Sequence, residues 1–247
     1  MNSLHALILG ILQGLTEFLP VSSSGHLVIF QSTIPNFSQP GIFFDVFVHL
    51  GTLLAVFIFF WKKIVKIQKE YLLHIAVASL PAVIVGLLFS RQIESLFLNV
   101  KIVGVALIIT GVLNFFTDKI QIKKENTIGL SNAFVIGLFQ AFAIIPGISR
   151  SGSTIFAGVW RKIDKAKAAQ FSFLLSLPAV FGASLLETIK YYDAFTFNYS
   201  FYLIGFVSAL FSGYFALSMV FKIIKKGKFE YFAYYCFIVG LTTLLFV

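Results

Sequence analysis

The chain has 247 residues, of which 58% are hydrophobic and 12% charged, and its mean hydropathy is +0.93. Soluble globular domains carry about 25% charged residues, so this composition excludes a soluble domain, and it also excludes disordered, collagen-like and coiled-coil chains. The single cysteine, Cys236, excludes an intramolecular disulfide and a cysteine-based zinc site. In a membrane protein the net charge of +9 indicates loops that face anionic lipid, so no nucleic-acid partner is predicted.

Eight apolar segments follow one another along the chain. Two of them, 3–33 and 130–160, are interrupted by polar segments containing Pro and Gly, and their arms of about 10–17 residues are too short to cross comfortably. Each is therefore predicted to be a re-entrant helix–loop–helix. The other six have the roughly 20 residues that a membrane crossing needs. These predicted transmembrane helices lie at 42–61, 72–90, 101–117, 168–188, 201–222 and 231–247.

The positions of the basic residues agree with this layout. If both re-entrant stretches return to the side they left, 15 of the 19 Lys and Arg residues lie opposite the N-terminus. Only Arg91, Lys101 and Lys190 share its side, while Arg150 lies in a loop tip. The positive-inside rule then makes the basic side cytoplasmic, which predicts a multi-pass protein of the cell membrane with both termini and the site toward the outer face.

The two halves of the chain resemble each other at an offset of 127 residues. The offset matches Gly10 with Gly137, Gln13 with Gln140, and Ser24-Gly25 with Ser151-Gly152. Each half, 1–120 and 128–247, contains one re-entrant loop and three crossings, so the second half is inverted relative to the first. The predicted fold is a single all-α membrane domain built as an inverted repeat, whose ligand site lies near mid-membrane where the broken helices meet.

The first broken stretch reads QGLTEFLPVSSSGH over residues 13–26. Gln13 and Glu17 are four residues apart and share one helix face. Pro20 ends that helix, and the serines that follow are N-cap candidates for the next one. These are Ser22, Ser23 and Ser24, and His26 follows them.

The second broken stretch reads PGISRSGST over residues 146–154 and repeats this arrangement. Ser149 and Ser151 precede a new helix, with Arg150 between them and Thr154 one turn on. Helix N-termini with hydroxyls beside them bind anions, phosphate above all, and arginine offers phosphate a planar fork. Glu17 and His26 add groups for metal binding and proton transfer.

Each of these residues has a purely structural alternative. The serines could act only as caps, Glu17 and Arg150 could form a structural ion pair, and His26 could be a satisfied interior imidazole. Asp45 and His49, spaced i, i+4, could form a structural pair or support the site. A glutamate inside an apolar helix costs about 2.5–3.5 kcal/mol at mid-bilayer, which favours a functional reading of Glu17.

These two motifs, in this order, resemble the undecaprenyl-diphosphate phosphatase family linked to bacitracin resistance. The resemblance spans the whole chain, including Asp45, His49 and the segment Leu50-Gly51-Thr52. Gln13 stands where many members carry Glu, which argues against two metal-binding carboxylates on that helix.

The resemblance implies hydrolysis of undecaprenyl diphosphate to undecaprenyl phosphate and inorganic phosphate, which recycles the lipid carrier of cell-wall synthesis. It also implies a divalent cation, Mg²⁺ or Ca²⁺, held at Glu17, and activity on the outer face of the membrane. The implied catalytic residues are Glu17, Ser23, His26 and Arg150. The predicted substrate-binding residues are Gln13, Ser22, Ser24, Ser149, Ser151 and Thr154.

Two chemical routes remain open at this point. Ser23 could attack phosphorus with His26 as base, for which a first-turn contact between them is expected, or His26 or Glu17 could activate water. A transporter or flippase of a lipid-linked or anionic substrate is the alternative function, since carriers share this architecture. The type-2 phosphatidic acid phosphatases are excluded, because Phe156 and Trp160 stand where that family needs His and Asp. The sequence leaves the oligomeric state open, a homodimer included.

Overall fold

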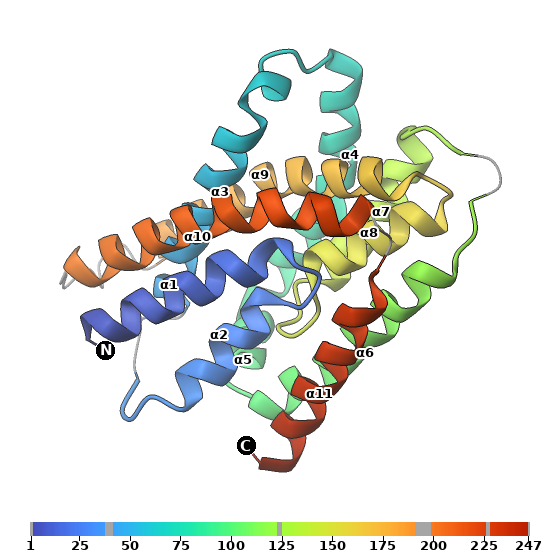
Figure 1. Cartoon of the computed structure of the whole chain (residues 1–247). Helices are drawn as coiled ribbons and strands as arrows, with labels where there is room; N and C mark the ends of the chain where they lie inside the picture. The colour runs from blue at the N-terminus through green and yellow to red at the C-terminus, as the bar shows by residue number, and fades with distance from the viewer. Residues whose placement is uncertain (1, 38–41, 123–124, 191–198, 226–227, 247) are drawn as a thin grey trace.

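The computed structural model describes residues 2–37, 42–122, 125–190, 199–225 and 228–246. The basic residues Lys123, Lys124 and Lys226 of the predicted cytoplasmic loops lie outside these ranges, as does the predicted outer loop at 191–198. Within the described ranges the chain is helical and contains no strand (Figure 1). The helices are α1 (Ser3–Phe18), α2 (Ser23–Ser32), α3 (Phe43–Ile64), α4 (Lys69–Leu88), α5 (Ser90–Leu96), α6 (Val100–Lys119), α7 (Leu130–Phe142), α8 (Arg150–Trp160), α9 (Lys165–Lys190), α10 (Tyr199–Lys225) and α11 (Glu230–Phe246).

Both interrupted stretches form two helices joined by a short loop, as predicted. The first loop, 19–22, separates α1 from α2, and the second, 143–149, separates α7 from α8. Ser22 caps α2 by accepting a hydrogen bond from the amide of Gly25, and Ser149 caps α8 by accepting one from Gly152. The two loops are called the first tip and the second tip below.

Five helices in the described residues are long and apolar enough to cross a membrane, namely α3, α4, α6, α9 and α10. Each corresponds to a predicted crossing, so the protein is polytopic and all-helical. The sixth predicted crossing forms α11, which has 17 residues and groups by length with the shorter apolar helices α1 and α7. The short helix α5 was not predicted, because its mostly polar sequence lies in the connection between the predicted crossings at 72–90 and 101–117.

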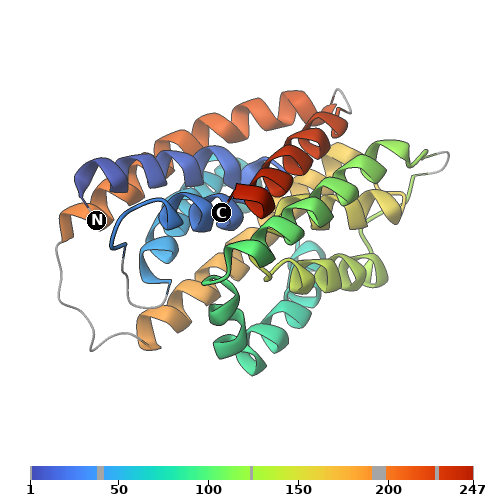
Figure 2. The same ribbon diagram turned by 90° about the horizontal axis from the view of Figure 1, so that it is seen from below.

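Three closely packed helix pairs join the two halves of the sequence. Helix α1 lies along α10, α7 lies along α4, and α6 lies along α11 (Figures 1 and 2). Small residues permit these close approaches: a Cβ on Gly10 would lie 2.4 Å from the carbonyl oxygen of Gly205, and one on Gly137 would lie 2.5 Å from that of Ala78. Both glycines therefore allow backbone-to-backbone packing that any larger residue would block.

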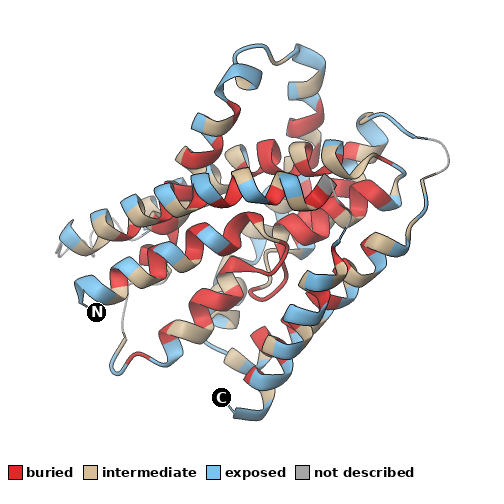
Figure 3. Ribbon diagram, in the orientation of Figure 1, coloured by how far each residue is buried: buried red, intermediate tan, exposed pale blue. Residues whose placement is uncertain are grey.

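Helix α6 anchors both tips at the centre of the molecule, where buried residues gather (Figure 3). Thr110 donates to the carbonyl oxygen of Gly147 and accepts from the amide of Ser149, both in the second tip. One turn further on, Asn114 donates to the carbonyl oxygen of Pro20 in the first tip. Pro20, Gly147 and Ser149 are buried, so these side chains satisfy backbone groups that would otherwise be costly to bury.

The second tip turns at Gly147, whose φ is +95°. A Cβ at this position would lie 2.6 Å from both the carbonyl oxygen of Val103 and the Cβ of Ala106. Gly147→Ala is therefore expected to destabilise the protein by about 1–2 kcal/mol from backbone strain alone, with the overlap adding to this. Thermal unfolding in detergent measures the effect, and Gly86→Ala, where a Cβ meets nothing within 4 Å, is the steric control. Equal melting temperatures for the two variants would contradict this description of the tip.

Candidate active site

Glu17 is the centre of the polar cluster that forms where the two tips meet. Its Oε2 accepts hydrogen bonds from Ser23 Oγ at 2.6 Å and from Gln13 Nε2 at 2.9 Å. Its Oε1 accepts from Arg150 Nη2 at 2.5 Å. The structure thus brings together four of the residues that the sequence singled out, although α1, α2 and α8 supply them separately.

Arg150 spans two acceptors with its planar guanidinium group. While Nη2 contacts Glu17, Nη1 donates to the carbonyl oxygen of Ser172 on α9 at 3.1 Å. The Ser172 hydroxyl lies 2.6 Å from that of Thr154. Ser23 and Arg150 are related by the same offset of 127 residues, so α2 and α8 each place the side chain of their first residue against the same carboxylate.

His49 also contacts this cluster, since its Nε2 lies 3.6 Å from Glu17 Oε2. Its Nδ1 lies 2.6 Å from the carbonyl oxygen of Asp45, which only accepts, so Nδ1 carries the hydrogen. Asp45 is buried and its Oδ1 accepts from Gln31 on α2 at 2.5 Å. Of the two alternatives for Asp45 and His49, the structure favours support of the site.

His26 does not make the expected contact with Ser23. Its Nδ1 lies 2.7 Å from the carbonyl oxygen of Ser22, and its Nε2 lies 2.7 Å from the hydroxyl of Tyr235 on α11. Both ring nitrogens are therefore occupied elsewhere, and the Ser23 hydroxyl donates to Glu17 instead. The spacing of three residues places Ser23 and His26 within one helical turn. The imidazole ring, however, contacts the first tip through Nδ1 and α11 through Nε2.

The remaining predicted binding residues lie around the cluster as cap and loop groups. Ser22 and Ser24 have their hydroxyl oxygens 3.3 Å apart, and Ser149 and Ser151 repeat this pairing at 3.2 Å. Ser151 also reaches the carbonyl oxygen of Leu19, which ties the two tips together. The first amides of α2 and α8 have no intrahelical partner by geometry, so both helix N-termini present donors to the same region.

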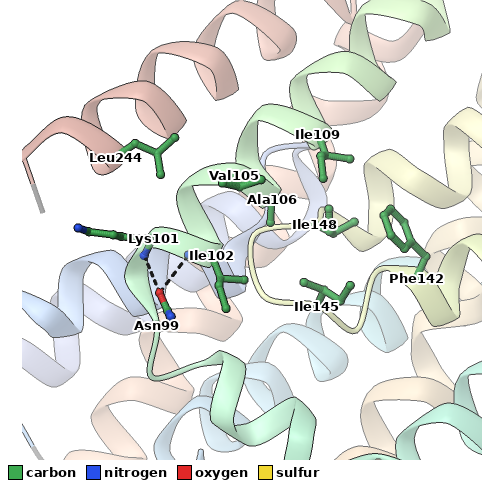
Figure 4. Close-up of a pocket in the computed structure, with 10 residues that line it drawn as sticks. All are labelled: Asn99, Lys101, Ile102, Val105, Ala106, Ile109, Phe142, Ile145, Ile148 and Leu244. Atoms are coloured by element: carbon green, nitrogen blue, oxygen red, sulfur yellow. Dashed lines mark hydrogen bonds between the residues drawn. The ribbon is translucent and has the colours of Figure 1, made fainter.

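Two cavities border this region. One, of about 450 Å³, lies between α6 and the second tip and is lined mainly by apolar side chains that include Ile145 and Ile148 (Figure 4). The other, of about 750 Å³, is lined in part by Arg91 and by the hydrogen-bonded pair Gln31 and Asp45. The first is therefore suited to a hydrocarbon chain and the second to polar groups.

The oxygen ligands available in this cluster suit a divalent cation whose remaining ligands come from the substrate. The described residues hold no cluster of three or more His, Cys, Asp or Glu side chains, so they form no all-protein cage. Gln13 Oε1, however, is buried with no hydrogen-bond partner among them, beside the Glu17 carboxylate. Mg²⁺ binds through one or two carboxylates together with phosphate oxygens, for which an amide oxygen and a carboxylate are suitable hard ligands.

Sequence reasoning overlooked three residues that shape the site. Thr110 and Asn114 anchor the tips from α6, and their signal was available as polar residues four apart in an otherwise apolar crossing. Tyr235 lies among the apolar and aromatic residues of the predicted crossing 231–247. Its contact with His26 joins residues 209 apart and leaves no local signal in the sequence.

The fold and this cluster together define a polytopic helical membrane protein with an acid–serine–arginine site between two buried helix N-termini. Comparison with known families extends this description. Residues 6–242 match the family described as bacitracin resistance protein BacA. The chain belongs to this family.

Curated relatives match over nearly the whole chain. The undecaprenyl-diphosphatase of Halothermothrix orenii is 42% identical, with 99% of this chain and 98% of the relative covered. Undecaprenyl-diphosphatase 4 of Bacillus cereus is 41% identical, with 99% and 97% covered. The undecaprenyl-diphosphatase of Methanococcus vannielii is 42% identical, with 98% and 99% covered.

Proposed function

We propose that this protein is a membrane phosphatase that hydrolyses undecaprenyl diphosphate to undecaprenyl phosphate and inorganic phosphate. The observation that carries the proposal is the contact of Ser23 and Arg150 with the two oxygens of one buried carboxylate, in a chain whose full-length relatives are named undecaprenyl-diphosphatases. The reaction regenerates the monophosphate lipid carrier of cell-wall synthesis. The description of the family names bacitracin resistance.

In the first chemical step, Ser23 Oγ attacks the terminal phosphorus. Glu17 Oε2, 2.6 Å away, takes the hydroxyl proton. The new bond joins phosphorus to Oγ while the bond to the bridging oxygen breaks, and its electron pair leaves with undecaprenyl phosphate. Arg150 and the first amides of α2 and α8 stabilise the charge that develops on the transferring phosphoryl group.

In the second step, water attacks the phosphoserine. A proton from the water reaches His26 Nε2, the electron pair of the breaking bond returns to the serine oxygen, and Glu17 gives back the proton it had taken. Inorganic phosphate leaves. The hydroxyls around the two tips hold the phosphate groups during both steps: Ser22, Ser24, Ser149, Ser151 and Thr154.

A divalent cation, Mg²⁺ or Ca²⁺, is proposed at Glu17 with Gln13 Oε1 as a second ligand. When bound, it would neutralise charge on the diphosphate. Gln13 also orients Glu17 through its amide nitrogen, which accounts for an amide at this position. The prenyl chain is proposed to extend over apolar surface such as the cavity beside Ile145 and Ile148 (Figure 4).

The architecture proposed from the sequence is six crossings and two re-entrant hairpins, arranged as an inverted repeat of 1–120 and 128–247. Equivalent packing supports it, since the partner of Gly10 at Gly205 and the partner of Gly137 at Ala78 are themselves 127 residues apart. Two ion pairs support the assignment of the loops to opposite sides of the membrane. Asp118 at the end of α6 pairs with Lys165 at the start of α9, and Glu94 pairs with Lys190 at the opposite end of α9.

This topology predicts which loops a membrane-impermeant thiol reagent reaches in intact cells. In a Cys236→Ala background, Leu98→Cys, exposed between α5 and α6, is expected to be labelled, and Lys66→Cys, between α3 and α4, is expected to be protected. Permeabilised cells supply the control, since both cysteines then react. Labelling of Lys66→Cys in intact cells would contradict the proposed orientation of the termini and site toward the outer face.

The transporter alternative is not favoured, because the full-length relatives are named as diphosphatases. Purified protein in detergent is expected to release phosphate from undecaprenyl diphosphate with no membrane gradient present. Assays across several prenyl diphosphates, with and without a chelator, measure chain-length preference and the need for a cation. Failure to release phosphate from any of them would contradict the proposed function.

A further inference from the structure

His26 is held by two groups of different kinds. Its Nδ1 faces the Ser22 carbonyl oxygen, which only accepts hydrogen bonds, so the ring hydrogen resides on Nδ1. In the neutral imidazole the other nitrogen, Nε2, then carries a lone pair, and the Tyr235 hydroxyl 2.7 Å away donates to it. Tyr235 therefore fixes both the tautomer and the direction of Nε2.

The packing around Tyr235 holds its ring in a defined position against His26. The rings of His26 and Tyr235 are nearly parallel, with an interplanar angle of 6° and centroids 5.5 Å apart. The next residue, Cys236, is buried with its Sγ 3.8 Å from the Pro20 carbonyl oxygen in the first tip. Two successive residues of the last helix thus contact the loop that presents Ser23.

Helix α11 is held at this distance by close packing on α6. A Cβ on Gly240 would lie 2.8 Å from the carbonyl oxygen of Gly104, and one on Gly111 would lie 3.1 Å from that of Ala233. These contacts flank Tyr235 on both sides along α11. The helix cannot shift along α6 without overlap, so the tyrosine hydroxyl has a defined position relative to His26.

We propose that Tyr235 relays the proton of the second step: the attacking water gives its proton to the Tyr235 oxygen while the Tyr235 hydroxyl gives its own proton to His26 Nε2. This inference rests on the proposed function, in which a proton from water reaches His26 Nε2. It extends the active site to α11, so that three parts of the chain far apart in sequence contribute to it. Loss of the hydroxyl is expected to lower turnover about tenfold, the effect of one hydrogen bond of ordinary strength.

The test is a double-mutant cycle of Tyr235→Phe and His26→Ala in the full-length protein, assayed in detergent with undecaprenyl diphosphate. Tyr235→Phe keeps the ring and removes only the hydroxyl. We expect kcat to fall about tenfold with KM within about twofold, and we expect no further fall when Tyr235→Phe is added to His26→Ala. Tyr234→Phe, the neighbouring and more exposed tyrosine, is the matched control and should retain wild-type kcat.

Two further measurements distinguish a role of Tyr235 in proton transfer from a purely structural role. The melting temperature of Tyr235→Phe should match that of Tyr234→Phe, and ¹⁵N spectra of histidine-labelled protein should show the Nε2 signal of His26 shifted only in Tyr235→Phe. Wild-type kcat in Tyr235→Phe beside an impaired His26→Ala would overturn this inference alone. A multiplicative loss in the double mutant would also overturn it. A fully active His26→Ala would contradict the role of His26 in the proposed function as well.

Discussion

Ser23→Ala is expected to lower the turnover of undecaprenyl diphosphate about 10⁶-fold, the scale seen when a nucleophile acting in a catalytic unit is removed. The reason is geometric: the Ser23 hydroxyl is the group that donates to Glu17, at 2.6 Å, so no other serine of the first tip is equally activated. Steady-state phosphate release measures the loss. Ser32→Ala, at the exposed end of α2, is the matched control and should keep full activity.

The partner of Ser23 in this unit is expected to be Glu17. Because the serine and its base act together, Ser23→Ala, Glu17→Gln and the double variant should all retain a similar residual rate. If water were the nucleophile and Ser23 merely donated a hydrogen bond to phosphate, Ser23→Ala would cost only about 10–100-fold. In that case the losses would multiply in the double variant, and the covalent route would be wrong.

Arg150→Lys is expected to lower kcat/KM about 10³-fold although the charge is kept, the lower end of the range for arginines that stabilise phosphoryl transfer. The guanidinium group contacts Glu17 through one nitrogen and Ser172 through another, and a single ammonium cannot reproduce both contacts. Arg161→Lys supplies the control, because Arg161 lies at the far end of α8 and donates to Asn132. Near wild-type activity in Arg150→Lys would mean that the site needs only positive charge.

The helices and their breaks could be predicted because their signals are local. Hydropathy located α3, α4, α6, α9 and α10, and Pro20 and Gly147 marked the two tips. The predicted segment 231–247 agrees with α11 to within one residue, whereas the short helix α5 was not predicted. Six crossings remain a proposal for a chain with five long apolar helices in its described residues.

The residues of the site could be predicted from the sequence, but the hydrogen bonds between them could not. The motifs contained Gln13, Glu17, Ser23 and Arg150, and these four do converge. Which residue accepts the Ser23 proton depended on side-chain direction, which sequence spacing does not give. His26 faces α11 and His49 approaches Glu17 because α3 and α11 pack against the tips, and such contacts arise only in the folded chain.

Acid-quench trapping during turnover tests the central claim, that Ser23 activated by Glu17 is the nucleophile, most directly. With undecaprenyl diphosphate radiolabelled on its terminal phosphorus, we expect labelled protein that carries the phosphate on Ser23. We expect no label in Ser23→Ala. Slowed dephosphorylation in His26→Ala should increase the trapped fraction. Full turnover by the wild-type protein with no label on Ser23, in quenches faster than a single turnover, would contradict the account.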